Sequence, residues 1–140
     1  MSGIAADAPA DNPHVIRSTD GKTALWVGAI DDVWKMGKPR GEGGPWLDSK
    51  VSAGQASDPY LMTGYDEKTL TLSHGSNKTI NLTIEVDLTG EGGGHWVEYQ
   101  TLPVAPGEAK QHRFPEGFSA YWVRFKADAD AVASAQLTYR

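Results

Sequence analysis

Thr79–Asp87, TINLTIEVD, is a stretch in which aliphatic and polar side chains alternate without a break. In an extended strand this alternation places the four aliphatic side chains, from Ile80 to Val86, on one face and the polar side chains on the other. A helix requires a period of about 3.6 residues, so the pattern predicts a strand with one buried face and one face in water.

Similar strand-like runs recur along the chain, separated by turns rich in glycine, proline, asparagine and aspartate. The expected strands span residues 14–17, 22–30, 59–65, 69–74, 79–87, 95–102, 110–114, 118–126 and 132–139. Residues 31–37 are expected to form one helical turn or an irregular segment, and Lys38–Trp46 a long loop rich in glycine and proline. Many short strands without a sustained helical pattern predict an all-β fold, an antiparallel two-sheet β-sandwich of the jelly-roll type.

The expected core consists of large apolar side chains on one face of each regular strand. They are Leu70, Leu72, Ile80, Leu82, Ile84, Val86, Tyr121, Val123 and Phe125. Val97 and Tyr99 are expected to face inward by the same alternation.

The length and composition of the chain limit the number of domains that it can form. A chain of 140 residues with 39% hydrophobic and 22% charged residues has the size and composition of one globular domain. We therefore expect a single sandwich domain over residues 14–140. Residues 1–13 are expected to form a loose arm, because their sequence of mainly Ala, Asp and Pro offers little apolar surface.

Composition also argues against several classes of function. Cysteine is absent, which excludes a disulfide framework, a thiol nucleophile and a cysteine-based zinc site. The net charge of -5, without a cluster of Lys or Arg, argues against nucleic acid as a partner. No apolar run reaches about eighteen residues, so we expect no membrane span. The start of the sequence also lacks the basic and apolar regions of a signal peptide.

Two of the expected strands carry tryptophan on their more polar face. Alternation places Trp122 beside Arg124, and Trp96 beside Glu98 and Gln100. Flat aromatic rings next to guanidinium, carboxylate and carboxamide groups suit a sugar, because the ring stacks on C–H groups while the polar groups bond the hydroxyls. The alternative is that each ring fills space between the sheets or lies under a loop, since tryptophan is mostly buried in proteins.

Trp34 and Trp46 lie on either side of the glycine- and proline-rich segment that begins at Lys38. As platforms carried by a long loop they join the candidate ligand-binding residues. The pattern favours a different role, in which each ring anchors the loop to the core.

Support for catalysis or metal binding is weak. Glu85 and Asp87 lie two positions apart on one strand face, roughly 6.5–7 Å apart, a separation that overlaps the range found in glycoside hydrolases. No nucleophile elbow, phosphate-binding loop or zinc-protease motif is present. Asp31–Asp32, and Asp87 with Glu91, offer oxygen ligands for calcium but match no calcium loop, and the four histidines lack metal-ligand spacing. We therefore expect no metal and no cofactor.

Three stretches, Leu25–Trp46, Ser57–His74 and Glu116–Lys126, together resemble a known type of sequence. They are similar to the C-terminal region of large, uncharacterised exported bacterial proteins whose upstream part looks like a β-propeller. The resemblance covers residues 14–140 and carries no catalytic motif. It implies an accessory β-sandwich within a longer chain in a secreted or periplasmic location, with Arg17–Ile30 derived in part from a propeller strand.

These observations predict a non-catalytic binding or accessory module whose ligand is a glycan or polysaccharide. The first alternative is a structural or protein-interaction domain that associates with itself or packs on a neighbouring domain, because Trp, Tyr and Arg also anchor protein interfaces. A glycosidase-type enzyme is the third hypothesis. Tryptophans in an open groove with converging polar groups would favour a sugar, and a flat patch would favour an interface.

Overall fold

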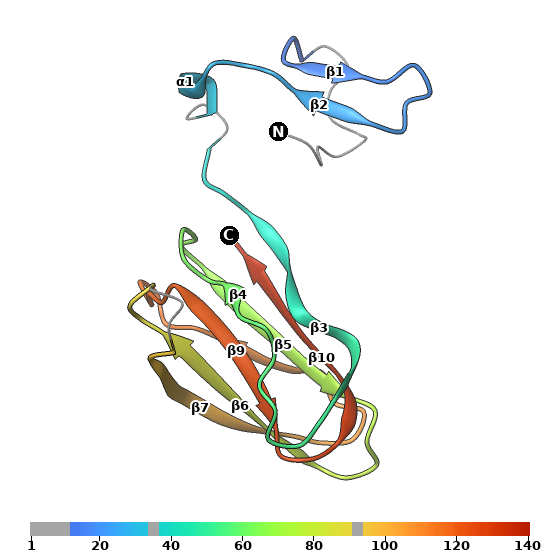
Figure 1. Ribbon diagram of the computed structural model, residues 1–140, viewed down its shortest axis with the longest axis vertical. Helices are drawn as coiled ribbons and strands as arrows, with labels where there is room; N and C mark the ends of the chain where they lie inside the picture. The colour runs from blue at the N-terminus through green and yellow to red at the C-terminus, as the bar shows by residue number, and fades with distance from the viewer. Residues whose placement is uncertain (1–11, 34–36, 91–93) are drawn as a thin grey trace. The chain divides into compact units, whose positions relative to one another are not determined.

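The computed structural model describes residues 12–33, 37–90 and 94–140 of the chain. The chain forms two compact units, Met1–Gly37 and Lys38–Arg140. Both four-stranded sheets of the described residues belong entirely to the second unit (Figure 1). Residues 1–11, which make up most of the expected arm, lie outside the described residues.

The first unit contains a short hairpin followed by one helical turn. Strand β1 (Val15–Arg17) pairs antiparallel with β2 (Ala24–Trp26), and α1 (Ile30–Val33) follows. The backbone N–H of Ser18 donates to the carbonyl of Thr23 at 2.9 Å and closes the turn between the strands. The predicted hairpin is therefore confirmed. No helix in the described part of the chain is long and apolar enough to cross a membrane.

The second unit consists of two antiparallel sheets that face each other (Figure 1). Its strands are β3 (Gly41–Val51), β4 (Tyr60–Leu61), β5 (Lys68–His74), β6 (Ile80–Asp87), β7 (Trp96–Val104), β8 (Lys110–Arg113), β9 (Trp122–Ala127) and β10 (Ala131–Tyr139). The first sheet has the strand order β3-β10-β5-β8, and the second has the order β4-β9-β6-β7. All of these pairs are antiparallel, which confirms the predicted all-β, two-sheet sandwich.

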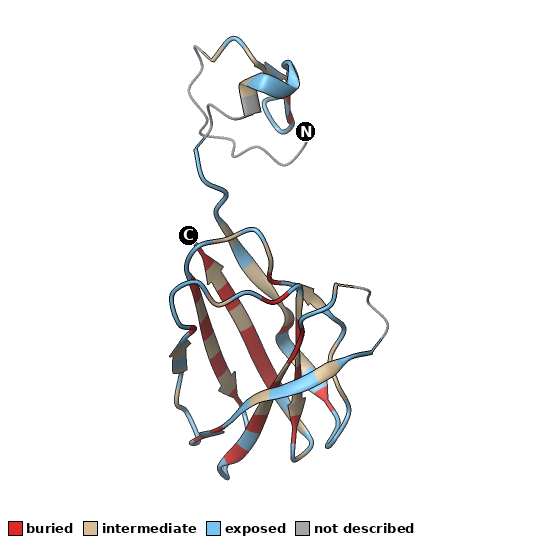
Figure 2. Cartoon of the chain, turned by 90° about the vertical axis from the view of Figure 1, so that its left-hand side faces the viewer, coloured by how far each residue is buried: buried red, intermediate tan, exposed pale blue. Residues whose placement is uncertain are grey.

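The core lies between the apolar faces of the two sheets. Buried residues alternate with partly or fully exposed ones along β5, along β9 and along β6 as far as Val86, as the period of two predicted (Figure 2). Asp87, at the end of β6, is buried as well. Eight of the nine predicted core residues are buried: Leu70, Leu72, Ile80, Leu82, Ile84, Val86, Val123 and Phe125. Because the inward side chains of β5 and β6 are packed in the core, the side chains on the opposite faces of these strands are directed toward water or a ligand.

The prediction that Lys38–Trp46 forms a loop is wrong, because β3 begins at Gly41 and runs to Val51. The glycines of this segment allow close packing. A Cβ atom at Gly44 would lie 1.9 Å from the carbonyl oxygen of Ala135 in β10. Glycine in a strand often marks such a close approach of another backbone, whereas the sequence pattern alone suggested a turn.

Two residues expected in the core are exposed. Tyr121 is 48% exposed because β9 begins one residue later, and its ring packs against the backbone of Gly90 in the turn after β6. Val97 is 53% exposed. It belongs to β7, an edge strand that has a neighbouring strand on one side only. The inward assignment of Tyr121 and Val97 is therefore wrong.

Candidate functional site

One row of side chains crosses the outer face of the second sheet and takes one residue from each of its four strands. Leu61 pairs with Trp122, Trp122 pairs with Asp87, and Asp87 pairs with Trp96. Directly opposite residues of antiparallel strands share a face, so the two tryptophans flank the Asp87 carboxylate. Two strand spacings of about 4.8 Å separate the backbones of Trp122 and Trp96 by about 10 Å. Both tryptophans are partly buried.

A second row lies next to the first and centres on Glu85. Its strand neighbours are Glu98 on β7 and Arg124 on β9. Arg124 Nε donates to Glu85 Oε2 at 2.5 Å, and Lys126 Nζ donates to Glu85 Oε1 at 2.6 Å. The guanidinium carbon of Arg124 also lies 4.2 Å from the centroid of the Trp96 ring. Glu85 and Trp96 together fix the position of Arg124 by charge, hydrogen bonding and cation–π contact.

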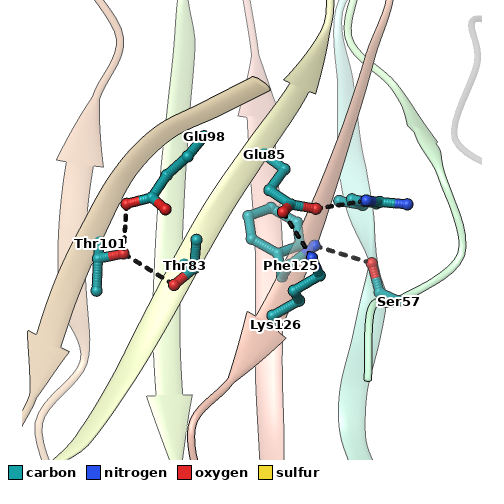
Figure 3. Close-up of polar contacts among 8 residues, drawn as sticks. Ser57, Thr83, Glu85, Glu98, Thr101, Phe125 and Lys126 are labelled. Carbon is teal, nitrogen blue, oxygen red and sulfur yellow. Dashed lines mark hydrogen bonds and ion pairs between the residues drawn. The ribbon is translucent and has the colours of Figure 1, made fainter. Parts of the chain in front are cut away.

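Hydroxyl groups extend this polar face toward β7. The hydroxyls of Thr83 and Thr101 lie 2.8 Å apart, and Thr101 donates to Glu98 Oε1 at 3.1 Å. Figure 3 shows Glu98, Thr101 and Thr83 as one hydrogen-bonded chain, beside the separate contact of Lys126 with Glu85. The face therefore carries donors and acceptors held at fixed positions by rigid strands.

The two carboxyl groups that suggested a glycosidase lack the properties of a general acid. Burial tends to raise the pKa of Glu85, but hydrogen bonds from Lys126 and Arg124 outweigh burial and lower this pKa. The pKa of Asp87 is lowered by hydrogen bonds from the backbone N–H and the hydroxyl of Thr89, both at 2.8 Å from Oδ1. A general acid in glycoside hydrolysis needs a raised pKa, whereas the contacts of both groups shift their pKa downward.

The structure brings together Trp122, Arg124, Trp96 and Glu98 on one face, and of the other described candidates neither Trp46 nor Gln100 joins them. Trp46 is buried, with only 6% of its surface exposed, and packs in the core with its ring centroid 6.0 Å from that of Phe125. Its assignment as a ligand platform is therefore wrong, and the alternative role as a core anchor is correct. Trp34 lies outside the described residues.

Gln100 does not continue the polar row of Trp96 and Glu98. The pairing of β6 with β7 shifts register between Ile84 and Glu85, so that Gln100 lies opposite Ile84, a core residue. A β-bulge of this kind inserts one extra residue and ends the strict alternation of faces. The sequence carries no signal for the bulge, and the expectation that Gln100 shares the face is wrong.

Sequence reasoning missed Leu61, and it assigned Glu85 and Asp87 a different role. Alternation alone places Glu85 and Asp87 on the outer face of β6. Their partners depend on the strand order, because Glu85 contacts Arg124 and Lys126 only when β6 lies beside β9. Leu61 gives no signal, because β4 has only two residues.

The candidate calcium ligands do not form a metal site within the described residues. No group of three or more His, Asp or Glu side chains is placed there to hold an ion. Asp32 accepts the backbone N–H of Ala29 at 3.1 Å, which is a local contact at the start of α1. Glu91, the expected partner of Asp87, lies outside the described residues.

Comparisons with protein-family models, with curated proteins and with solved structures found no match to this chain.

Proposed function

We propose that the outer face of the second sheet binds glycans, with Trp122 and the ring face of Trp96 that Arg124 does not cover as stacking platforms. The observation that carries the proposal is the row in which the two tryptophans lie on either side of one strand. Their backbones lie two strand spacings apart, about 10 Å, a distance on the scale of two sugar rings of one chain. Aromatic platforms bind the C–H faces of sugars and leave the hydroxyl groups to polar neighbours.

Arg124 and Glu98 supply complementary partners for sugar hydroxyls. Arg124 uses Nε for Glu85, and its two terminal nitrogens have no hydrogen bond within the described residues. Glu98 is exposed and accepts one hydrogen bond through Oε1, from Thr101, and its second oxygen has no hydrogen bond within the described residues. A donor pair and an acceptor on one face match neighbouring hydroxyl groups, each of which both donates and accepts.

Self-association through the same end of the sheet is the second candidate function. Four large apolar side chains in or near the row of Leu61, Trp122, Asp87 and Trp96, here called the tryptophan row, are exposed. They are Leu61, Leu88, Val97 and Tyr121. Aromatic and aliphatic side chains of this kind anchor protein interfaces when they lie together. A second copy of the chain presents the same face, and a two-fold interface joins identical surfaces.

The test is the substitution Trp122→Ala, measured by retention on a panel of immobilised polysaccharides and by affinity electrophoresis. An aromatic platform contributes about 1.4 kcal/mol, so its loss should weaken binding about tenfold while the strand spectrum is retained. Leu47→Ala is the matched control. Leu47 is an exposed apolar residue in β3, on the other sheet, and its truncation should leave retention unchanged.

Three outcomes separate the hypotheses. A folded Trp122→Ala variant with unchanged retention on every glycan bound by the parent protein would exclude this face as the glycan site. A parent protein that binds no glycan but forms a dimer, weakened by Trp122→Ala in sedimentation, would support self-association instead. Loss of folding would show that Trp122 contributes chiefly to stability, because truncation of a core aromatic costs about 3–5 kcal/mol.

A further inference from the structure

A lysine occupies an inward position at the start of β5. Lys68 follows the same alternation as Leu70 and Leu72, and only 5% of its surface is exposed. Its Nζ donates to the carbonyl of Tyr65 at 2.6 Å and to the carbonyl of Phe118 at 3.0 Å. The ammonium group therefore joins the turn before β5 to the loop after β8.

The charge of Lys68 has no carboxylate in ion-pair contact within the described residues. The two acidic residues just before it in sequence are each bound to another cation. Asp66 pairs with Lys38, and Glu67 pairs with Arg113 at 3.3 Å. An isolated buried charge is unfavourable unless it is paired, and two neutral carbonyls satisfy it only in part. Burial accordingly lowers the pKa of Lys68, and the nearby charge of Asp66 offsets part of this effect.

Lys68 also lines a cavity of about 400 Å³. The walls are residues 63–66 from the turn before β5 and residues 116–119 from the loop after β8. The volume falls within the range of small-molecule sites, about 300–1,000 Å³. Thr63 and Ser119 add two hydroxyl groups that have no hydrogen bond within the described residues.

We propose that this cavity binds a small oxyanion, whose oxygen accepts the third N–H of the Lys68 ammonium group. A protonated lysine has three donors, and the two backbone carbonyls use only two of them. The anion supplies the missing counter-charge, and the hydroxyls of Thr63 and Ser119 donate to its remaining oxygens. The residues of this cavity come from different strands and loops than those of the tryptophan row. The proposal of an oxyanion site therefore does not depend on glycan binding at that row.

Two acidic side chains on the cavity wall, Glu116 and Asp66, oppose an anion, and Glu116 is the one without an ion pair within the described residues. Its side chain is exposed, and no hydrogen bond or ion pair involves it within the described residues. Its charge repels an incoming oxyanion, as does the charge of Asp66, although Asp66 is also paired with Lys38. Removal of the negative charge of Glu116 should therefore strengthen binding of an oxyanion in the cavity.

The experiment titrates the full chain with acetate, inorganic phosphate and glucuronate, followed by backbone amide NMR at constant ionic strength. Chloride and glucose serve as the simple anion and the neutral sugar. We expect saturable shifts at Gly64, Gly117 and Ser119 with the oxyanions and none with glucose. Acetate and phosphate acting alike would identify a free anion as sufficient. Tighter binding of glucuronate than of acetate would identify a carboxylate carried by a larger molecule.

Three variants assign the effect to Lys68. Lys68→Met should weaken binding at least tenfold, and Glu116→Gln should strengthen it several-fold. Lys110→Met is the matched control, because Lys110 is a surface lysine paired with Glu108 and does not line the cavity. Unchanged binding in a folded Lys68→Met variant would overturn the proposal. If the Lys68→Met variant does not fold, the titration of the parent protein tests the proposal instead. Amide shifts scattered over surface lysines, or equal shifts with chloride, would then overturn the proposal.

Discussion

Gly44 lies directly against the backbone of β10, and a single methyl group there has no space. A Cβ atom would lie 1.9 Å from the carbonyl oxygen of Ala135 and 3.0 Å from the Cα atom of Gln136. Both neighbours are backbone atoms, so no side chain is able to rotate away. The strand pair must separate to accept any residue larger than glycine.

We therefore expect Gly44→Ala to reduce the free energy of unfolding by about 1–3 kcal/mol or more, the cost of overpacking a core. The measurement is urea denaturation followed by tryptophan fluorescence. Gly75→Ala is the matched control, because its Cβ would meet nothing closer than 3.8 Å and its backbone needs no left-handed conformation. Equal stability of the two variants would contradict the close approach of β3 and β10.

Single residues also show where sequence reasoning succeeded and where it failed. Trp122 and Arg124 share a face because alternation holds through β9. Gly44 suggested a turn, because a glycine that permits close packing looks identical in sequence to a glycine that permits a turn. The residue type of Lys68 gave no indication that it is buried. Its spacing from Leu70 and Leu72 is the pattern that places it on the inward face of β5.

Strand β6 is joined to its neighbour β9 by the side chain of Glu85. Its carboxylate binds Arg124 and Lys126, both from β9, and its side chain is only 13% exposed. Removal of the negative charge would leave two partly buried cations next to each other. The pair β6–β9 is therefore held by one carboxylate in addition to its backbone hydrogen bonds.

We expect Glu85→Gln to lower the free energy of unfolding at neutral pH by about 1–3 kcal/mol, the range for charged hydrogen bonds. The folded protein lowers the pKa of Glu85 below its ordinary value of 4.5. The stabilisation is therefore present above pH 4.5 and is lost as the pH falls through the lowered pKa. Denaturation curves at neutral and acidic pH should show the difference between parent and variant shrinking as the pH falls.

Glu98→Gln provides the control for this prediction, since Glu98 lies opposite Glu85 on β7 but is exposed and contacts only a threonine hydroxyl. Its effect should stay within about 0.5 kcal/mol. A Glu98→Gln variant as unstable as Glu85→Gln would show that general charge, and not the contact with β9, determines stability.

Strand β7 shows how far the inward and outward faces of a strand can be predicted from sequence. Its residues Trp96 and Glu98 follow the expected alternation, and Leu102 and Val104 end the strand inward. Between Glu98 and Leu102 the bulge shifts the alternation, so that Gln100 lies opposite Ile84 and does not continue the row of Trp96 and Glu98, although it is exposed. Strand pairing and bulges depend on which strands become neighbours, and a single strand sequence does not contain that information.

The molecule as a whole divides at Gly37 and Lys38. All the strands of the two four-stranded sheets lie between Gly41 and Tyr139, so the sandwich contains a complete core without the first unit. The hairpin β1–β2 contributes no strand to either sheet in the described residues.

We expect deletion of residues 1–37 to leave the strand spectrum intact and to change the melting temperature by less than about 4 °C, which corresponds to under 1 kcal/mol for a domain of this size. Deletion of residues 1–51 is the informative contrast, because it also removes β3 and the core residue Trp46. Circular dichroism should show that this longer deletion prevents folding. A large loss of stability after the shorter deletion would mean that the first unit supports the sandwich.

The order of strands in the first sheet has a consequence for synthesis on the ribosome. Strand β10 lies between β3 and β5, so β3 has no partner in its sheet until the last strand has been made. At about 5–20 residues per second, β3 waits on the order of 4–16 s for β10 to be translated. During that interval an unpaired strand is open to association with other nascent chains. The waiting strand begins with GEGGPW, and glycine and proline are the residues least suited to stacking into intermolecular β-structure.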